Sequence, residues 1–395
     1  MGIFKRSGDL SRHDYANRVL AEVRRAGAAE AWYDSDAFAV RFRRVPADSV
    51  ATINLSRLYQ EATGMPAAER DQRIARFVAD VVTPASLPET WEAVAPLLRP
   101  VLRAATFGQS TDMLFRPALP YLREAVVIDQ PSTMAYVKAD KLAAWGVPAE
   151  QVFATARENL ARIAAMPDEP PADGPALLRF VDDGDGYFVS RLLLDGWLAG
   201  LAGRVGGRPV AFAPDQNSLL VTGDQPDAMA QLYELVESEY RDAPRSVSPV
   251  GYTVDNSGRV VPYAPPPGHP VEAVVHRAEV VLAATEYQAQ GDYLNERHQA
   301  EGRDVFVASL MAAGRDDGSV FTVASWADGV EALLPAADFV ALNADGVESF
   351  YVPWEVAART AALEPADGLY PPRYHVQGWP PPPVLDQLKT QATRP

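Results

Sequence analysis

The sequence predicts an α+β fold that is built on antiparallel sheets. Helix, strand, turn, strand and helix patterns follow one another twice, near residues 12–64 and near residues 187–243. After a long helical pattern, short strand patterns separated by Asp-Gly turn signals continue to about residue 362. We therefore expect repeated helix–strand–strand–helix units, followed by a domain that consists of a helix and a β-meander.

The first predicted subdomain covers residues 1–166. Apolar residues recur at helical spacing across residues 12–28, with arginines opposite them, and Gly27 ends this amphipathic helix. Residues 31–45 predict two short strands, because apolar residues and arginines alternate in the second of them. Further along, the patterns predict helices over 49–64, 69–82 and 147–166 and paired strands over 124–130 and 133–140.

The second predicted subdomain covers residues 176–264. The preceding segment, MPDEPPADGP (166–175), has the composition of a linker. Within the subdomain we expect, in order, a strand over 176–181, an acidic turn, a helix over 187–207, a hairpin around Asp215-Gln216-Asn217, a helix over 227–243, and a hairpin that turns at Asn256-Ser257-Gly258.

The third predicted domain covers residues 271–362 and follows the stiff, proline-rich linker PPPGHP. It begins with a long helix over 271–299 and continues as the β-meander. The remaining residues, 363–395, are rich in proline, and we expect them to form a mostly extended or disordered tail.

The composition excludes several functional classes. The chain of 395 residues contains no cysteine, which removes disulfides, thiolate metal sites and cysteine nucleophiles and fits a reducing cytoplasm. The start lacks the apolar stretch of a secretory signal, and no uninterrupted apolar run is long enough to span a bilayer. With a net charge of −16 and scattered basic residues, we expect a cytoplasmic protein that binds neither nucleic acid nor membranes.

Four segments carry a resemblance to a known family. They are RPVLRAATF (99–107), VVIDQPSTMAYV (126–137), DGYFVSRLLL (185–194) and APDQNSLLVTGD (213–224). Over roughly residues 10–265 the chain resembles the YtpQ-like bacterial proteins of unknown function, and its C-terminal part resembles the extension of longer members. The resemblance implies a soluble, cytoplasmic bacterial protein. That family has no established catalytic motif, so the resemblance assigns no functional residue.

The acidic turn DDGDGY (182–187) is the most pointed candidate for a site. Alignment with a calcium-binding loop places Val181 and Leu192 at ligand positions, so the loop pattern fails. A phosphate loop would need Lys and Ser or Thr at a helix start, whereas aspartates stand here and repel an anion. We therefore expect a strand-to-helix turn whose aspartates cap the following helix.

Other candidates for catalysis are weaker still. The glycines of GLAGRVGG (200–207) end a helix instead of joining a strand to one, so they do not form a dinucleotide fingerprint. Ser190 has no nucleophile elbow around it. No two of the five histidines lie at metal-ligand spacing. The sequence therefore predicts no catalytic residue, no metal site and no cofactor.

The resulting hypothesis is a non-catalytic binding or regulatory protein with an unidentified protein or small-molecule partner. Its expected binding surface joins the acidic turn to the neighbouring hairpin loop, through Asp182, Asp183, Asp185, Tyr187, Asp215 and Gln216. Two alternatives stay open. One is a divalent-metal-dependent hydrolase or transferase that uses the acidic turn at 182–185. The other is a structural protein that forms a homo-oligomer through the C-terminal sheet edge and Trp354.

Overall fold

The structure is a computed structural model, and it confirms the α+β class with several antiparallel sheets. The chain divides into two compact units, residues 1–97 with 128–135, and residues 98–127 with 136–395. The predicted linker 166–175 lies outside the described residues. The structure describes residues 10–46, 50–82, 87–130, 134–164, 177–182, 186–344 and 347–395.

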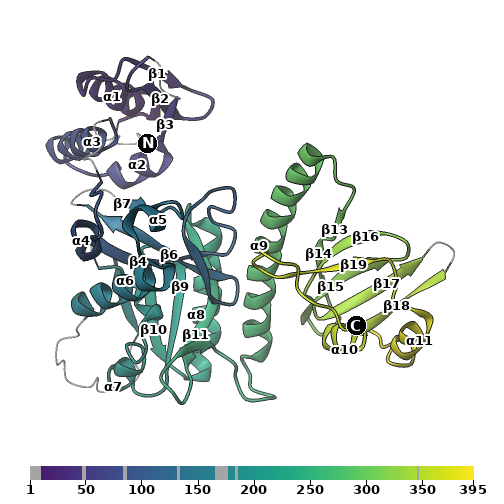
Figure 1. Ribbon diagram of the computed structural model, residues 1–395. Coiled ribbons are helices and arrows are strands. Elements are labelled where there is room, and N and C mark those ends of the chain that lie inside the picture. Colours follow the sequence, from purple (N-terminus) through teal and green to yellow (C-terminus); the bar gives the residue numbers. More distant parts are fainter. Residues whose placement is uncertain are drawn as a thin grey trace, which may run out of the picture. The chain divides into compact units, whose positions relative to one another are not determined.

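The first unit contains a three-stranded antiparallel sheet with helices beside it (Figure 1). Ser11 starts the first helix, because its hydroxyl accepts the Asp14 N–H at 3.1 Å. The core includes the buried side chains of Tyr15, Val19 and Phe42. The elements are α1 (Arg12–Arg25), β1 (Glu30–Asp34), β2 (Ala39–Arg43), β3 (Ala51–Asn54), α2 (Leu55–Ala62), α3 (Ala67–Val82), α4 (Trp91–Val94) and the 3₁₀ turn η1 (Ala95–Leu97).

The helix predicted over 49–64 is only half right. Its first part is strand β3, in which Ile53 is buried opposite Val40 of β2. Asn54 separates the two elements, because its side-chain oxygen accepts the Ser56 N–H at 3.0 Å and caps α2. The cap therefore fixes where the helix begins, and the residues before it are free to pair with β2.

The second unit holds two sheets that are followed by a long helix. One has the order β4-β6-β5, with β7 beside β6, and the other has the order β12-β11-β9-β10-β8. Every residue of β9 and β10 is buried except Asp215, so helices and turns cover both faces of the second sheet. The elements are β4 (Leu98–Ala104), β5 (Phe115–Leu119), β6 (Leu122–Asp129), β7 (Met134–Tyr136), α5 (Lys141–Trp145), α6 (Ala149–Ile163), β8 (Leu178–Val181), β9 (Pro209–Asp215), β10 (Ser218–Gly223), α8 (Pro226–Asp242), β11 (Ser246–Val254) and β12 (Val260–Pro262).

The single helix predicted over 187–207 is wrong. Three short helical pieces stand there instead: η2 (Val189–Leu193), η3 (Ala199–Leu201) and α7 (Ala202–Val205). The backbone is extended at Leu194, and Gly196 has a φ of 79°, which breaks the helical path. The N–H of Gly196 donates to the carbonyl of Gly258 instead, at 2.9 Å. The apolar residues of this segment therefore mark a buried irregular turn.

Helix α9 (Glu272–Glu301) runs for 30 residues between the second sheet and the C-terminal strands (Figure 1). Val275, Ala278 and Leu282 join the core of the second sheet. Leu294, farther along the helix, packs against Val307 at the start of the C-terminal strands. One helix therefore contributes to two hydrophobic clusters.

The C-terminal strands form two sheets, β13-β16-β19 and β14-β15-β17-β18. In a simple meander β15 would pair with β16, but here it pairs with β17 in parallel, and β16 belongs to the other sheet. The helix-plus-strand organisation is thus confirmed with a different strand order. The elements are β13 (Phe306–Val307), β14 (Leu310–Gly314), β15 (Val320–Ala327), β16 (Glu331–Pro335), β17 (Phe339–Ala344), β18 (Val347–Pro353), α10 (Trp354–Thr360), β19 (Arg373–Gln377) and α11 (Pro382–Thr390).

The expectation of a disordered tail over 363–395 is wrong. Strand β19 pairs with β16 in antiparallel fashion, and α11 places Leu388, which is fully buried, in the C-terminal core. The prolines help to order this segment, because Pro381 and Pro382 stand at the start of α11, where a missing N–H costs nothing. Proline content alone therefore did not indicate disorder.

Arg373 attaches β19 to α9. Its side chain is fully buried and donates to Gln290 Oε1 at 2.7 Å and to the carbonyl of Tyr287 at 2.9 Å, both on α9. It also donates to the carbonyls of Ala308 at 2.7 Å and Leu333 at 3.1 Å. A single guanidinium group thus satisfies acceptors on the helix and on the strands, which holds the two together.

Candidate functional site

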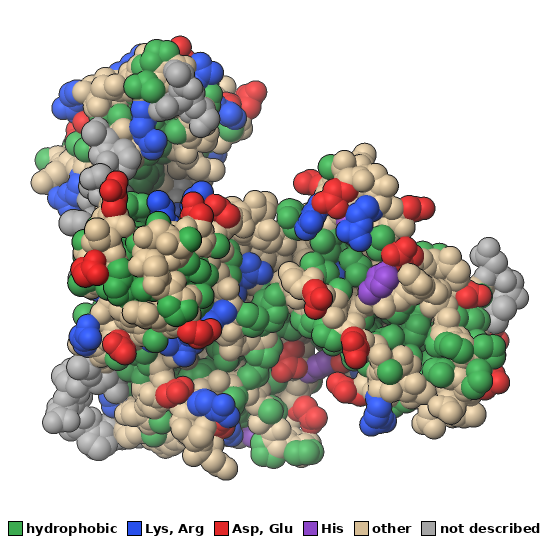
Figure 2. All heavy atoms as spheres, in the orientation of Figure 1, with side chains coloured by type: hydrophobic (Ala, Val, Ile, Leu, Met, Phe, Trp, Pro, Cys, Tyr) green, Lys and Arg blue, Asp and Glu red, His purple; other side chains and the backbone are tan. Residues whose placement is uncertain are grey.

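A pocket with a volume of about 380 Å³ lies where α9 meets the C-terminal strands. We call it the α9 pocket. Residues from the β5–β6 turn, β11, α9, β15, α10 and β19 contribute to its walls. In the space-filling view, acidic side chains and a histidine are visible in the hollow beside the C-terminal strands (Figure 2). The residues that matter for its chemistry are Tyr121, Tyr252, His276, Glu279, Asp338, Trp354, Glu355 and Tyr374.

The imidazole of His276 stands between two carboxylates. Its Nε2 lies 3.4 Å from Asp338 Oδ2, and its Nδ1 lies 3.6 Å from Glu279 Oε2. Hydrogen bonding to Asp338 and then to Glu279 raises the pKa of His276 to about 10, and burial opposes this only in part. The side chain is therefore a cation at neutral pH, and each ring nitrogen lies near a carboxylate.

Asp338 is fixed in place by Thr322. The N–H and the hydroxyl of Thr322 donate to Asp338 Oδ2 at 2.7 and 2.9 Å, and the Asp338 N–H donates back to the Thr322 hydroxyl at 2.8 Å. Burial opposes ionisation of Asp338, but these donors and His276 outweigh it and hold the pKa of the carboxyl below its usual range. The two Thr322 donors and the His276 nitrogen all approach Oδ2. The second oxygen, Oδ1, therefore remains available to another donor.

Aromatic side chains form much of the remaining wall. Trp354 and Tyr374 meet edge to face, with ring centroids 5.0 Å apart. Burial raises the pKa of both Tyr121 and Tyr252, so that their hydroxyl groups are neutral at neutral pH. Tyr121 and Tyr374 are part-buried and present apolar ring surface to the pocket, whereas Tyr252 and Trp354 are buried behind it, at 1% and 6% exposure.

The backbone at Tyr121 is strained. Its φ is 60°, in the left-handed region that a bulky side chain adopts at a cost of roughly 1–2 kcal/mol. The Tyr121 carbonyl accepts the Ala105 N–H at 2.8 Å, and the ring meets Tyr287 edge to face at 5.7 Å, which together hold this conformation. Strain of this kind concentrates at binding and catalytic sites. At Tyr121 it directs an aromatic ring toward the α9 pocket.

The charge of the α9 pocket is negative. Glu279, Asp338 and Glu355 contribute three carboxylates, while His276 is the sole basic residue among the described residues that line it. The side chains of His276, Glu279 and Asp338 are 36%, 46% and 32% exposed, so solvent reaches all three. A ligand would meet a site with aromatic walls and an excess of negative charge.

The acidic turn and the hairpin loop that the sequence singled out lie side by side. The Asp182 N–H donates to the carbonyl of Asn217 at 2.7 Å. Asp215 Oδ1 in turn accepts the Asn217 N–H at 2.6 Å, and the Gln216 N–H donates to the carbonyl of Arg245 at 3.2 Å. Asp182 therefore lies beside the hairpin loop, and backbone hydrogen bonds hold it there. Asp183 and Asp185 lie outside the described residues.

Asp182 does not cap a long helix, because none follows it. Its Oδ1 instead accepts the Gly186 N–H at 3.0 Å. The Tyr187 ring is 6% exposed and packs in a core with Val101 and Leu160, so it presents no exposed contact surface. The positive charge near the turn belongs to Arg191, whose Nε donates to the Gly186 carbonyl at 3.0 Å.

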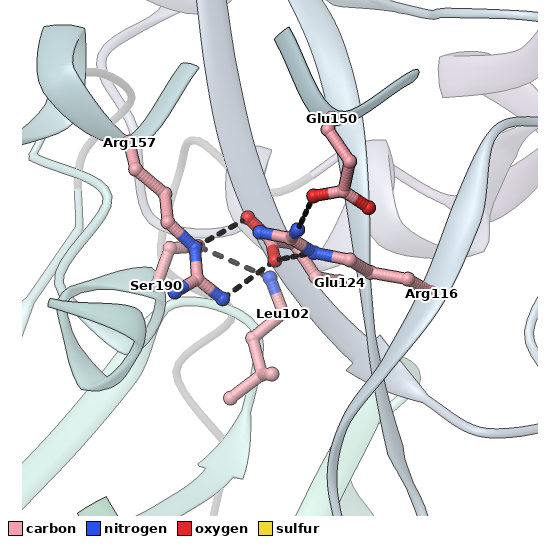
Figure 3. A network of polar contacts seen from close by, with 6 residues as sticks. All are labelled: Leu102, Arg116, Glu124, Glu150, Arg157 and Ser190. Carbon is pink, nitrogen blue, oxygen red and sulfur yellow. Dashed lines mark hydrogen bonds and ion pairs between the residues drawn. The ribbon is translucent and has the colours of Figure 1, made fainter. Parts of the chain in front are cut away.

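A buried carboxylate organises the region between β6 and α6 (Figure 3). Glu124 is fully buried and accepts two hydrogen bonds from Arg157, at 2.7 and 2.9 Å, and one from Arg116 at 2.7 Å. Arg116 also reaches Glu150 at 3.0 Å. Two arginines compensate one buried charge, which indicates a structural network rather than a reactive group.

Ser190 also has a structural role in this region (Figure 3). It is 4% exposed, and its hydroxyl accepts the N–H of Leu102 in β4 at 3.2 Å. A nucleophile would need an exposed hydroxyl beside a base, and this hydroxyl is buried against a strand. The expectation that Ser190 is not a nucleophile agrees with this placement.

In the described ranges no group of three or more His, Cys, Asp or Glu side chains lies in an arrangement that could hold a metal ion. Across the same ranges, no helix combines the length and the apolar character that crossing a membrane requires. In comparisons with family models, with curated proteins and with solved structures, the chain matches none.

Sequence reasoning missed the α9 pocket. His276 and Asp338 are 62 positions apart, and spacing rules test only neighbours in the chain. One signal was present: His276 and Glu279 are three residues apart on a predicted helix and so share a face. The second carboxylate and the aromatic walls come together only through the fold.

Proposed function

We propose that the protein is a non-catalytic binding protein and that the α9 pocket holds its ligand. The observation that carries the proposal is the combination of aromatic walls with a few fixed polar groups in a pocket of about 380 Å³. Small-molecule sites typically have volumes of about 300–1,000 Å³ and this mixture of surfaces. The strained Tyr121 backbone on the rim supports the same assignment.

The protonation states favour binding over catalysis. His276 already carries a proton and lies between Asp338 and Glu279, so it is a poor general base near neutral pH. Asp338 is ionised and engaged by Thr322 and His276, which leaves no proton for it to donate as an acid. Such groups orient and hold a ligand.

The wider assignment follows the sequence. We propose a cytoplasmic bacterial protein of the YtpQ-like group, with a small molecule or a protein side chain as partner. The net charge of −16 supports the view that nucleic acid and anionic membranes are not partners. The absence of cysteine supports a reducing compartment.

A pocket-filling variant tests the proposal. Ala337 lines the α9 pocket in the loop between β16 and β17, so Ala337→Phe should occupy part of its volume. Ala300→Phe, at an exposed position on α9, is the matched control. Compounds from a diverse fragment library that bind the wild-type protein in ligand-observed NMR should also bind the control but not Ala337→Phe. Melting temperatures and far-UV circular dichroism establish that both variants are folded.

The proposal fails if no compound shows binding that depends on Ala337. Fragments that bind equally to wild type, control and pocket-filling variant would place the binding elsewhere on the protein and would also contradict it.

A further inference from the structure

Resting on the proposed binding function, we infer that the α9 pocket selects an organic cation: an ammonium or guanidinium group attached to an apolar or aromatic body. Three features of the pocket lead to this ligand class. They are the imbalance of charge, the engagement of its one cation, and the nature of its walls.

The first feature is the imbalance of charge. Glu279, Asp338 and Glu355 line the pocket together with a single basic residue, His276. The carboxylate of Glu355 is exposed and takes part in no ion pair or hydrogen bond with another described residue. Asp338 adds its second oxygen, Oδ1, because both donors of Thr322 and the Nε2 of His276 approach Oδ2. The pocket therefore offers solvent-accessible acceptors that suit a donor-rich ligand.

The second feature excludes an anionic ligand. An anion would need His276, but Nε2 of that ring faces Asp338 and Nδ1 faces Glu279. To bind an anion, the imidazolium would have to move away from these two carboxylates. A carboxylate or phosphate entering the α9 pocket would thus meet three like charges and no free cation.

The third feature distinguishes an organic cation from a metal ion. The part-buried rings of Tyr121 and Tyr374 supply accessible apolar wall, which a hydrated metal ion cannot use. The described carboxylates do not form a cluster that could coordinate a metal. An alkyl- or arylammonium group would gain from the carboxylates, and its body would cover the apolar wall.

The experiment compares three probes of similar size and different charge. Phenethylamine is a cation at neutral pH, 2-phenylethanol is neutral, and 3-phenylpropanoate is an anion. Dissociation constants are measured with the full chain by ligand-observed NMR titration. We expect phenethylamine to bind at least about tenfold more tightly than 2-phenylethanol, and 3-phenylpropanoate to bind most weakly.

Two variants connect the selectivity to the pocket. Glu355→Gln removes a carboxylate that has no partner to lose, so it should weaken phenethylamine binding severalfold and leave 2-phenylethanol binding unchanged. Glu296→Gln, at an exposed position on α9 outside the pocket, is the matched control and should change neither.

The outcomes separate the inference from the proposed function. Equal affinity for the three probes, or preference for the anion, overturns the cation inference, while Ala337-dependent binding would leave the binding function standing. If none of the three probes binds, but library fragments bind and Ala337→Phe abolishes their binding, the inference alone fails. If no fragment binds in that manner, the proposed function fails, and the inference fails with it. Phenethylamine binding that Glu355→Gln does not weaken also counts against the inference.

Discussion

His276 makes the stability of this protein depend on pH. Its pKa rises from the ordinary value of 6.5 to about 10 in the folded chain, through Asp338 and Glu279. Below pH 6.5 the imidazole is protonated in both states, and the stabilisation is fully present. As pH rises from 6.5 toward 10, the unfolded chain loses the proton that the folded chain retains, so the stabilisation declines and is absent above about 10. The variant His276→Gln should lack this dependence.

The size of the effect is smaller than the pKa shift suggests. Taken alone, a rise from 6.5 to about 10 would correspond to a ceiling of about 5 kcal/mol. The imidazole is 36% exposed, and its distances of 3.4 and 3.6 Å exceed those of a good hydrogen bond. Solvent therefore screens the pairs, and we expect wild type to lose about 1–2 kcal/mol relative to His276→Gln across this range.

Urea unfolding of both proteins at several pH values between about 6 and 10 measures this difference. Tryptophan fluorescence is a suitable signal because Trp354 lines the same pocket. The control is His375→Gln, which removes a pair with Glu331 whose side chains are 43% and 42% exposed, and it should cost less than about 1 kcal/mol. Parallel stability curves for wild type and His276→Gln over the whole range would refute the reasoning.

Three further predictions concern the framework. Arg373→Met removes four hydrogen bonds to buried acceptors, partly offset by removal of a buried charge, and should cost about 3–5 kcal/mol in urea unfolding; a loss below about 1 kcal/mol would contradict its role. Glu124→Gln should cost about 2–4 kcal/mol because it strips two arginines of a buried partner, whereas Glu150→Gln, at a side chain 81% exposed, should cost under about 1 kcal/mol; similar losses would show that burial does not decide the cost. Gly251→Ala places a methyl group 2.6 Å from the Tyr233 hydroxyl and should lower stability by about 1–3 kcal/mol in the same assay, so an unchanged midpoint would mean that the ring moves freely aside.

Elements whose signals are local could be predicted from the sequence. The helical pattern over 271–299 corresponds to α9, and that over 227–243 corresponds to α8, each within two residues at both ends. The hairpin around Asp215–Asn217 was also predictable, because its turn residues hydrogen-bond within the turn. In such cases neighbouring residues supply the interactions that fix the structure.

Elements that depend on distant contacts could not be predicted. Residues 187–207 carry a helix-like apolar pattern, but Gly196 bonds to Gly258 and the segment folds as separate turns. The tail is ordered because β16 pairs with β19, and proline composition carries no information about that partner. The α9 pocket combines residues from Tyr121 to Tyr374, so no local window of sequence could have contained it.

The dual packing of α9 constrains how this chain can be shortened. Cutting away everything after Gly302 would uncover Leu294 and the acceptors that Arg373 serves, and cutting before Glu272 would strip Val275 and Leu282 from the sheet they cover. Each fragment would therefore expose apolar residues that are buried in the full chain. A shorter version of this chain would therefore need other residues to bury α9, or it would have to lack both α9 and the C-terminal strands that pack against it.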